Sequence, residues 1–203
     1  YYDGEDQLVI SAKGYAGVEY TYDENGNQTK EVYKDENDKP LVVESLGYAG
    51  IQKEYDENNR LVGTKYLDQS GQVMSSKEGY DDYKCSYDEN GNKVEERYLD
   101  AKGNLMLVPS KGYAMVKHAY NKNNKETDIW YFDEKEEPLM VKGVYHIAKE
   151  YDGNGNVTAE KRYSVDESLV VEPNGRAWTE KEYNKIAQGI SETSRDQDGN
   201  ALI

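Results

Sequence analysis

The sequence predicts an all-β protein built as an elongated tandem array of β-hairpins, with about six units of about 32 residues. Three observations lead to this fold class. A glycine recurs every 31 to 33 residues, a tyrosine follows each glycine eight positions later, and Asp-x-Asn-Gly turns separate short β-branched runs. The repeating glycines are Gly14, Gly47, Gly79, Gly112, Gly143 and Gly175. We expect each unit to pack only on its neighbours, in a superhelical stack or a wound antiparallel sheet.

The regular repeat spacing indicates that the chain is one array and not several separate domains. Residues 1–203 form a single repeat array, with approximate units at 1–13 (partial), 14–46, 47–78, 79–111, 112–142, 143–174 and 175–203, the last degenerate and truncated. The chain begins and ends inside a unit, so we expect it to be a piece of a longer array.

The first predicted element of each unit is a hairpin turn. Asp23-Glu24-Asn25-Gly26 places Asp at the first position of a type I turn and Gly at the fourth, where a left-handed residue closes a three-residue loop with a bulge. Asn59 and Asn124 replace that glycine in two units, and Asn is the next residue to tolerate a left-handed backbone. The pattern therefore indicates backbone geometry rather than ligand chemistry.

A strand is expected on each side of the turn, followed by a shorter third strand. The first inward position of the second strand is β-branched in every unit: Thr29, Val62, Val94, Thr127, Thr158 and Ile190. A second tyrosine follows four residues later in the first four units, and the fifth unit slips by one residue before Tyr163. A short apolar run such as residues 41–43 then returns the chain to the next glycine.

Composition limits the possible functions. Leu, Ile, Val and Phe number only 35, while 20 tyrosines supply large rings that bury well and keep a polar hydroxyl. A net charge of −15 disfavours binding to nucleic acid, and no apolar run is long enough to insert into a membrane. The single cysteine excludes an internal disulfide.

No residue pattern predicts an active site, a metal site or a cofactor. The two histidines, His118 and His146, occupy non-equivalent positions, and His118 is expected to pair with Asp128 across the hairpin. The turns do not match known calcium loops, because glycine comes fourth where an EF-hand needs it sixth. We therefore expect a protein that is not an enzyme.

Two periodic sets of side chains are candidate ligand-binding residues. Rings beside carboxylates and amides suit sugars, which offer an apolar C–H face and hydroxyl groups. The candidate stacking residues are Tyr15, Tyr48, Tyr80, Tyr113, Trp130 and Trp178, and the candidate polar groove residues are Glu31, Glu96, Glu160 and Glu192. The alternative is that the tyrosines form the core and the glutamates accept hydrogen bonds between stacked units.

Two known repeat families resemble parts of this chain. The stretches at 22–27, 87–92 and 151–156 resemble the Tyr-Asp-x-x-Gly core of RHS or YD repeats, and residues 1–9 resemble the aromatic hairpin of bacterial cell-wall-binding repeats of the choline- and glucan-binding type. These resemblances imply a large bacterial protein, extracellular or at the cell surface, whose array binds glycan or encloses cargo. The unit length near 32 and the Gly-Tyr-Ala opening depart from cell-wall-binding repeats.

The function expected from the sequence is a non-catalytic repeat module of a larger bacterial surface or secreted protein. Its expected partner is cell-wall polysaccharide or another glycan. The alternative is a structural spacer or a scaffold that binds another surface protein.

Overall fold

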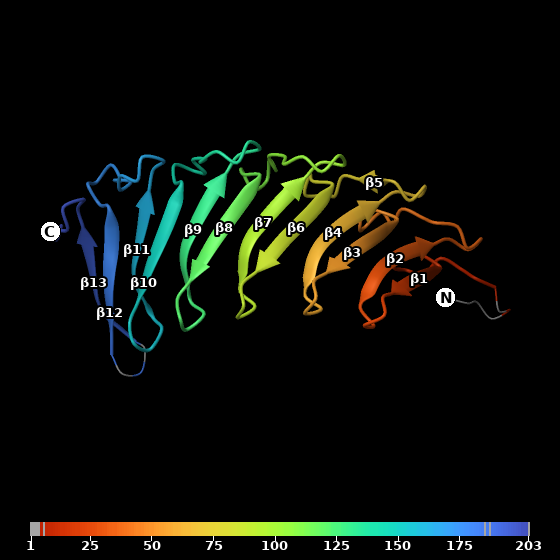
Figure 1. Cartoon of the computed structure of the whole chain (residues 1–203), viewed down its shortest axis with the longest axis horizontal. Coiled ribbons are helices and arrows are strands. Elements are labelled where there is room, and N and C mark those ends of the chain that lie inside the picture. The colour runs from red at the N-terminus through yellow and green to blue at the C-terminus, as the bar shows by residue number, and fades with distance from the viewer. Residues whose placement is uncertain (1–4, 6, 185, 187, 203) are drawn as a thin grey trace. The chain divides into compact units, whose positions relative to one another are not determined.

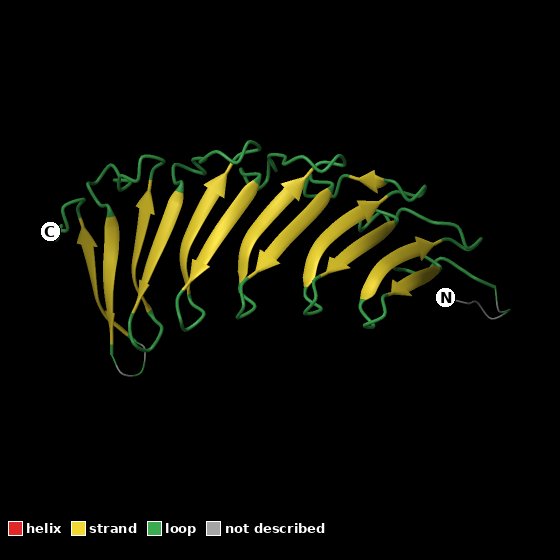
Figure 2. Cartoon of the chain, viewed as in Figure 1, coloured by secondary structure: helices red, strands yellow, loops and turns green. Residues whose placement is uncertain are grey.

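The computed structural model describes residues 5, 7–184, 186 and 188–202, and all its regular secondary structure there is β-strand (Figure 2). Contacts within the chain define two compact units. Unit 1 comprises residues 1–86 and 96–111, and unit 2 comprises residues 87–95 and 112–203.

The strands follow one another as hairpins (Figure 1). Their bounds are β1 Gly17–Tyr22, β2 Gln28–Lys34, β3 Gly50–Tyr55, β4 Leu61–Leu67, β5 Val73–Met74, β6 Asp82–Tyr87, β7 Lys93–Leu99, β8 Met115–Tyr120, β9 Glu126–Phe132, β10 His146–Tyr151, β11 Val157–Tyr163, β12 Trp178–Tyr183 and β13 Gly189–Arg195.

Each unit is an antiparallel sheet with its strands in chain order. Unit 1 holds β1-β2-β3-β4-β6 with β5 beside β4, unit 2 holds β8 to β13, and β6 and β7 are divided between the units. Strands of one hairpin pair over six positions, as between Gly17↔Lys34 and Tyr22↔Gln28. Strands of successive hairpins pair over three, as in Lys30↔Gln52 to Val32↔Gly50. The predicted all-β array of hairpin repeats is confirmed.

The predicted hairpin turns form as expected. In the first, Asp23 Oδ1 accepts hydrogen bonds from the backbone N–H groups of Asn25 and Asn27 at 3.0 and 2.8 Å, and the strand register shifts at Tyr22. Gly26 has a φ of 83° and Asn59, at the same turn position, a φ of 60°. Both are left-handed, a conformation that Gly and Asn tolerate best. The second turn of the repeat also places Asp38, Glu136 and Glu167 in it, at φ of 61 to 63°.

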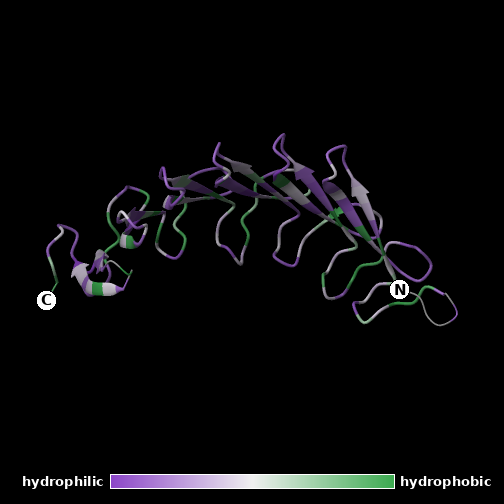
Figure 3. Ribbon diagram, turned by 90° about the horizontal axis from the view of Figure 1, so that it is seen from below, coloured by the Kyte–Doolittle hydropathy of each residue, from purple (hydrophilic) through white to green (hydrophobic). Residues whose placement is uncertain are grey.

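The prediction of a third strand is wrong in most of the 32-residue repeats. Among the described residues, β5 alone forms a two-residue strand at this place, and the other runs make single bridges such as Val43↔Tyr48 and Leu99↔Leu105. These apolar segments lie in the connecting loops, where Figure 3 shows hydrophobic stretches outside the strands. With two main strands per repeat, every hairpin starts in the same direction, so the repeats remain equivalent without a third strand.

The buried core lies where each connecting loop meets its hairpin. The residue two positions after the repeat glycine is a buried alanine in four repeats, as Ala16 and Ala49 at 0 % exposure illustrate. Val43 and Val108 of the connecting loops are also fully buried. The core of each repeat is therefore thin, and the tyrosines complete it.

The predicted slip in the fifth repeat is wrong. His146↔Tyr163 pairs in β10 and β11 as Gly17↔Lys34 pairs in β1 and β2, so Tyr163 occupies the place of Lys34. Arg162 therefore occupies the place of Tyr33. The register of the whole hairpin is kept, because a one-residue slip would turn every side chain to the other face of the sheet.

Candidate functional site

In unit 1 the tyrosines after the repeat glycines and the second tyrosines of the hairpins make one continuous row of contacting rings. Neighbouring ring centroids are 4.9 to 6.2 Å apart and the rings are tilted by 48 to 62°. We call this the tyrosine row, and its members are Tyr15, Tyr33, Tyr48, Tyr66, Tyr80 and Tyr98. In unit 2 the same repeat positions hold Tyr113 and Tyr131, with ring centroids 5.1 Å apart.

The rings of the tyrosine row are buried or half-buried rather than exposed to solvent. Tyr33, Tyr80 and Tyr98 are 8, 7 and 4 % exposed, and Tyr15, Tyr48 and Tyr113 are half-buried. Burial raises the pKa of Tyr48 and Tyr80, and the pKa of Tyr33 is raised by burial and by its hydrogen bond to Glu31. Tilted and edge-to-face ring contacts of this kind stabilise a core.

The four candidate glutamates have two different roles. Glu31 accepts hydrogen bonds from the Tyr33 hydroxyl and from Gln28 Nε2, and Glu96 accepts one from the Tyr83 hydroxyl at 2.5 Å. In these repeats the carboxylate accepts from a tyrosine hydroxyl of its own hairpin, whereas the alternative predicts such bonds between stacked units. Glu160 instead accepts from Arg162 at 3.0 and 3.1 Å, and Glu192 lies 3.9 Å from Lys181 Nζ.

The two tryptophans lie in different surroundings. Trp130 stacks on His146 with centroids 4.8 Å apart and rings inclined by 17°, and His146 stacks in turn on Tyr163 at 5.1 Å. Trp178 has Lys161 Nζ 5.1 Å from its ring centroid. Trp130, His146 and Tyr163 are direct cross-strand partners, so a correct register would have predicted their stack.

The predicted pairing of His118 with Asp128 is wrong. His118 is opposite Ile129, and its Nδ1 lies 2.8 Å from Glu126 Oε1. Asp128 lies 2.8 Å from His146 Nε2 in the next hairpin. The cause is the hairpin register, which moves Asp128 opposite Ala119 and turns it to the other face of the sheet.

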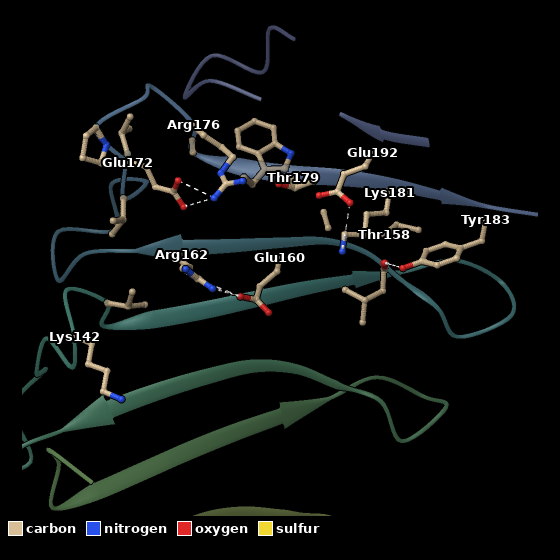
Figure 4. Close-up of a pocket in the computed structure, with 18 residues that line it drawn as sticks. Lys142, Thr158, Glu160, Arg162, Glu172, Arg176, Thr179, Lys181, Tyr183 and Glu192 are labelled. Carbon is tan, nitrogen blue, oxygen red and sulfur yellow. Dashed lines mark hydrogen bonds and ion pairs between the residues drawn. The ribbon is translucent and has the colours of Figure 1, made fainter. Parts of the chain in front are cut away.

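A pocket of about 540 Å³ opens in unit 2 between β11, β12 and the loop that joins them (Figure 4). At the repeat positions of the tyrosine row this part of the chain carries Val144, Arg162 and Arg176, and all three line the pocket. We call it the β11–β12 pocket. It appears where the chain replaces stacked rings by a small side chain and two arginines.

Paired charges and apolar side chains form the wall of the β11–β12 pocket. Arg176 Nη2 donates to both carboxylate oxygens of Glu172 at 2.7 Å. Arg162 binds Glu160 of the same strand, and Lys181 approaches Glu192 (Figure 4). Thr158 and Thr179 contribute hydroxyl groups, and the apolar part of the lining includes Val157, Val170, Ala177 and Trp178.

The structure therefore brings together three of the ten predicted site residues. Glu160, Glu192 and Trp178 line one pocket, whereas Glu31 and Glu96 bind tyrosine hydroxyls. Of the candidate tyrosines, Tyr80 is buried and Tyr15, Tyr48 and Tyr113 are half-buried. Sequence reasoning missed Arg162 and Arg176. The signal was available, because Arg176 follows the repeat glycine Gly175 directly, where four other units have tyrosine.

The described residues contain no group of three or more histidine, cysteine, aspartate or glutamate side chains arranged to hold a metal ion. A search of the same residues finds no helix suited to crossing a membrane.

No protein-family model matches the chain, and no curated protein sequence matches it. Solved structures do resemble it. TcdB2-TccC3 without its hypervariable C-terminal region aligns at a TM-score of 0.52 and 14 % identity, over 88 % of this chain and 7 % of that one. A second TcdB2-TccC3 structure (TM-score 0.38, 12 % identity, 94 % of this chain and 10 % of that one) and a Photorhabdus luminescens Tc holotoxin pore (0.35, 11 %, 94 % and 11 %) are more distant.

The likeness with a TM-score above 0.5 shows a shared fold. It is a likeness of fold to that TcdB2-TccC3 structure, at 14 % identity. The resemblance to cell-wall-binding repeats stays a prediction. The chain spans 7 to 11 % of the length of these neighbours.

Proposed function

We propose that this chain is a non-catalytic structural module of a larger bacterial protein, secreted or at the cell surface, in which stacked hairpins form a scaffold. One recurring contact carries the proposal. The tyrosine that ends the first strand of a hairpin donates its hydroxyl hydrogen to a backbone carbonyl at the start of the preceding hairpin's second strand. The contacts are Tyr55 to Gln28, Tyr120 to Lys93, Tyr151 to Glu126 and Tyr183 to Val157, at 2.6 to 3.0 Å.

This contact joins repeats rather than strands within a repeat. Its partners lie 25 to 27 residues apart, whereas residues within a hairpin are separated by far less. A hydrogen bond that recurs at equivalent positions holds neighbouring hairpins at a constant spacing, which suits a spacer or a support for other proteins. The second support is the tyrosine row, whose rings are used for packing.

The test is binding to purified bacterial cell walls and to a glycan array, with Tyr48→Phe and Tyr48→Ala as matched variants. In a scaffold the tyrosine row binds no sugar, so both variants bind walls and glycans to the same extent as the wild type. Wall binding that survives Tyr48→Phe but is lost in Tyr48→Ala and in Tyr113→Ala, with both alanine variants still folded, would show that the rings bind sugar and would contradict the scaffold.

Glycan binding is the second candidate function, and one observation favours it. Trp178, Glu160 and Glu192 come from both predicted sets of ligand-binding residues, and they meet in the β11–β12 pocket. A glycan would then be bound at one place in unit 2 rather than along the whole array. Another surface protein remains the alternative partner.

A further inference from the structure

We propose that the β11–β12 pocket is a binding site for a neutral, hydroxyl-rich ligand, a short oligosaccharide. The proposal rests on glycan binding, the second candidate function, and it names the site and the charge class of the ligand. Three features of the pocket support it: its origin in the repeat, the pairing of its charges and its mixed lining.

The pocket exists because this part of the chain departs from the repeat. In unit 1 every position of the tyrosine row carries a ring, and each ring lies 4.9 to 6.2 Å from the next. Val144 is much smaller than the tyrosine it replaces. Arg162 and Arg176 turn toward Glu160 and Glu172 instead of stacking on a neighbour. Around 540 Å³ is left open, within the range of roughly 300–1,000 Å³ typical of small-molecule sites.

Three of the four cationic side chains of the pocket are paired with carboxylates. Four cationic side chains line it, Lys142, Arg162, Arg176 and Lys181, together with the anionic side chains of Glu160, Glu172 and Glu192. Three of the cations lie 2.7 to 3.9 Å from these carboxylates. An ionic ligand would have to compete with these existing pairs, so the site favours a ligand without a strong charge.

Paired groups still have donors and acceptors to spare. A guanidinium group has five N–H donors in one plane, and a carboxylate accepts several hydrogen bonds on its two oxygens. Arg176 Nη2 donates to both Glu172 oxygens, which leaves its Nε and Nη1 donors outside this pair. Donors beside acceptors match adjacent hydroxyl groups on a sugar ring, each of which both donates and accepts.

The remaining lining suits the apolar face of a sugar. Val144, Val170 and Ala177 add apolar surface to the lining, and Thr158 and Thr179 (Figure 4) add hydroxyl groups. A pyranose presents C–H groups on its faces and hydroxyls around its edge. Both kinds of surface therefore find a partner in one pocket.

The test compares variants that refill the pocket with one that does not. Arg162→Tyr and Val144→Tyr restore the residue of the tyrosine row and close the space. Arg195→Tyr is the matched control, because Arg195 lies outside the pocket, pairs with Glu180 at 2.5 Å and occupies the position that Tyr163 holds one repeat earlier. Binding of the whole chain to an array of neutral and carboxylated oligosaccharides is measured, followed by titration calorimetry on the best neutral glycan.

We expect the wild type and Arg195→Tyr to bind a neutral oligosaccharide, and both pocket variants to bind at least about tenfold more weakly with unchanged or higher melting temperature. If the wild type and all three variants bind glycan equally, the glycan does not bind in the β11–β12 pocket. Glycan binding elsewhere on the chain would then remain the function. Binding of carboxylated glycans alone would overturn the ligand class. If no glycan binds at millimolar concentration, both the glycan function and this inference are wrong.

Discussion

At the scale of single residues, the turns depend on a few positions with special backbone conformations. Gly91 has a φ of 83° with no atom within 4 Å of the place where a Cβ would stand, so the space is free and only the backbone conformation is restrictive. Gly153 also has open space and lacks the left-handed φ. Comparing substitutions at the two glycines therefore measures the cost of the left-handed backbone without any contribution from steric crowding.

We predict that Gly91→Ala lowers the free energy of unfolding of unit 2 by about 1 kcal/mol, because a Cβ disfavours the left-handed backbone. Gly153→Ala should change it by less than about 0.5 kcal/mol. Both tryptophans lie in unit 2, so chemical denaturation followed by tryptophan fluorescence measures the effect there. Equal effects of the two substitutions would show that backbone strain is not the cause.

The turn aspartates make stability depend on acid. Hydrogen bonds from the Asn92 side chain and from the backbone amides of Asn90 and Asn92 lower the pKa of Asp88 below its ordinary 3.8. A depressed pKa stabilises the fold fully above 3.8, and this contribution is lost as the pH falls through the folded-state value.

We therefore predict that the free energy of unfolding falls as the pH drops below about 4. Asp88→Asn should keep the turn, because Asn121, at the same position of the next repeat, accepts the same two backbone hydrogen bonds at 2.9 and 3.1 Å. The substitution should reduce the slope of the free energy of unfolding against pH by an amount equivalent to less than one proton. Urea denaturation between pH 2.5 and 7 measures both slopes. If the free energy of unfolding depends on pH with the same slope in the variant and the wild type, Asp88 does not cause the loss of stability in acid.

At the scale of the element, a hairpin pairs with its neighbour over three strand positions, and side-chain contacts add to this pairing. The short pairing between β9 and β10, Trp130↔His146 to Asp128↔Ala148, is typical of the array. The hydroxyl of Tyr151 adds a 2.6 Å hydrogen bond to the carbonyl of Glu126. This bond recurs at equivalent positions of other repeats, whereas the His146–Asp128 contact belongs to this interface.

We predict that Tyr151→Phe destabilises unit 2 by about 1 kcal/mol, because the interface loses a hydrogen bond while the ring remains. Tyr22→Phe is the matched control, since Tyr22 occupies the same repeat position, is 57 % exposed and has no preceding hairpin among the described residues. Thermal unfolding followed by circular dichroism gives both values. An effect of Tyr22→Phe as large as that of Tyr151→Phe would contradict the role in joining repeats.

At the scale of the whole molecule, the equivalence of the repeats means that a complete repeat can be deleted while the remaining repeats keep their arrangement. Deleting Gly79–Lys111 removes one repeat of 33 residues and joins residue 78 to Gly112, the next repeat glycine. Deleting Gly79–Asn92 removes β6 without β7 and reverses the direction of the next strand.

We predict that the whole-repeat deletion folds with the same β-sheet circular dichroism per residue, because stability in such arrays is a sum over repeats and their interfaces. The half-repeat deletion should lose that signal. Unfolding of both proteins would show that the chain has one indivisible core.

We also predict an extended particle in solution. A compact chain of this length has a radius of gyration of about 17 Å. Small-angle scattering should give a clearly larger value, since each repeat is expected to contact only its neighbours. A value near 17 Å would contradict the elongated array.

The sequence alone determined the hairpins of this protein, because their causes are local. Gly and Asn tolerate a left-handed turn position best, and the recurrence of Gly26 and Asn59 at that position is enough to locate the loops. The repeat spacing then predicts the number and order of the hairpins. The predicted third strand failed because a short apolar run such as residues 41–43 also suits a loop folded into the core.

Only the tertiary structure decided what the side chains do. A tyrosine such as Tyr80 has the same local sequence whether its ring is buried or exposed, and contacts with Tyr66 and Tyr98 from neighbouring strands bury it. The place of Arg162 depends on the register of β10 and β11, which moves all side chains of a strand together. The β11–β12 pocket is formed by residues from two successive repeats, so its existence depends on packing between repeats and cannot be determined from either one alone.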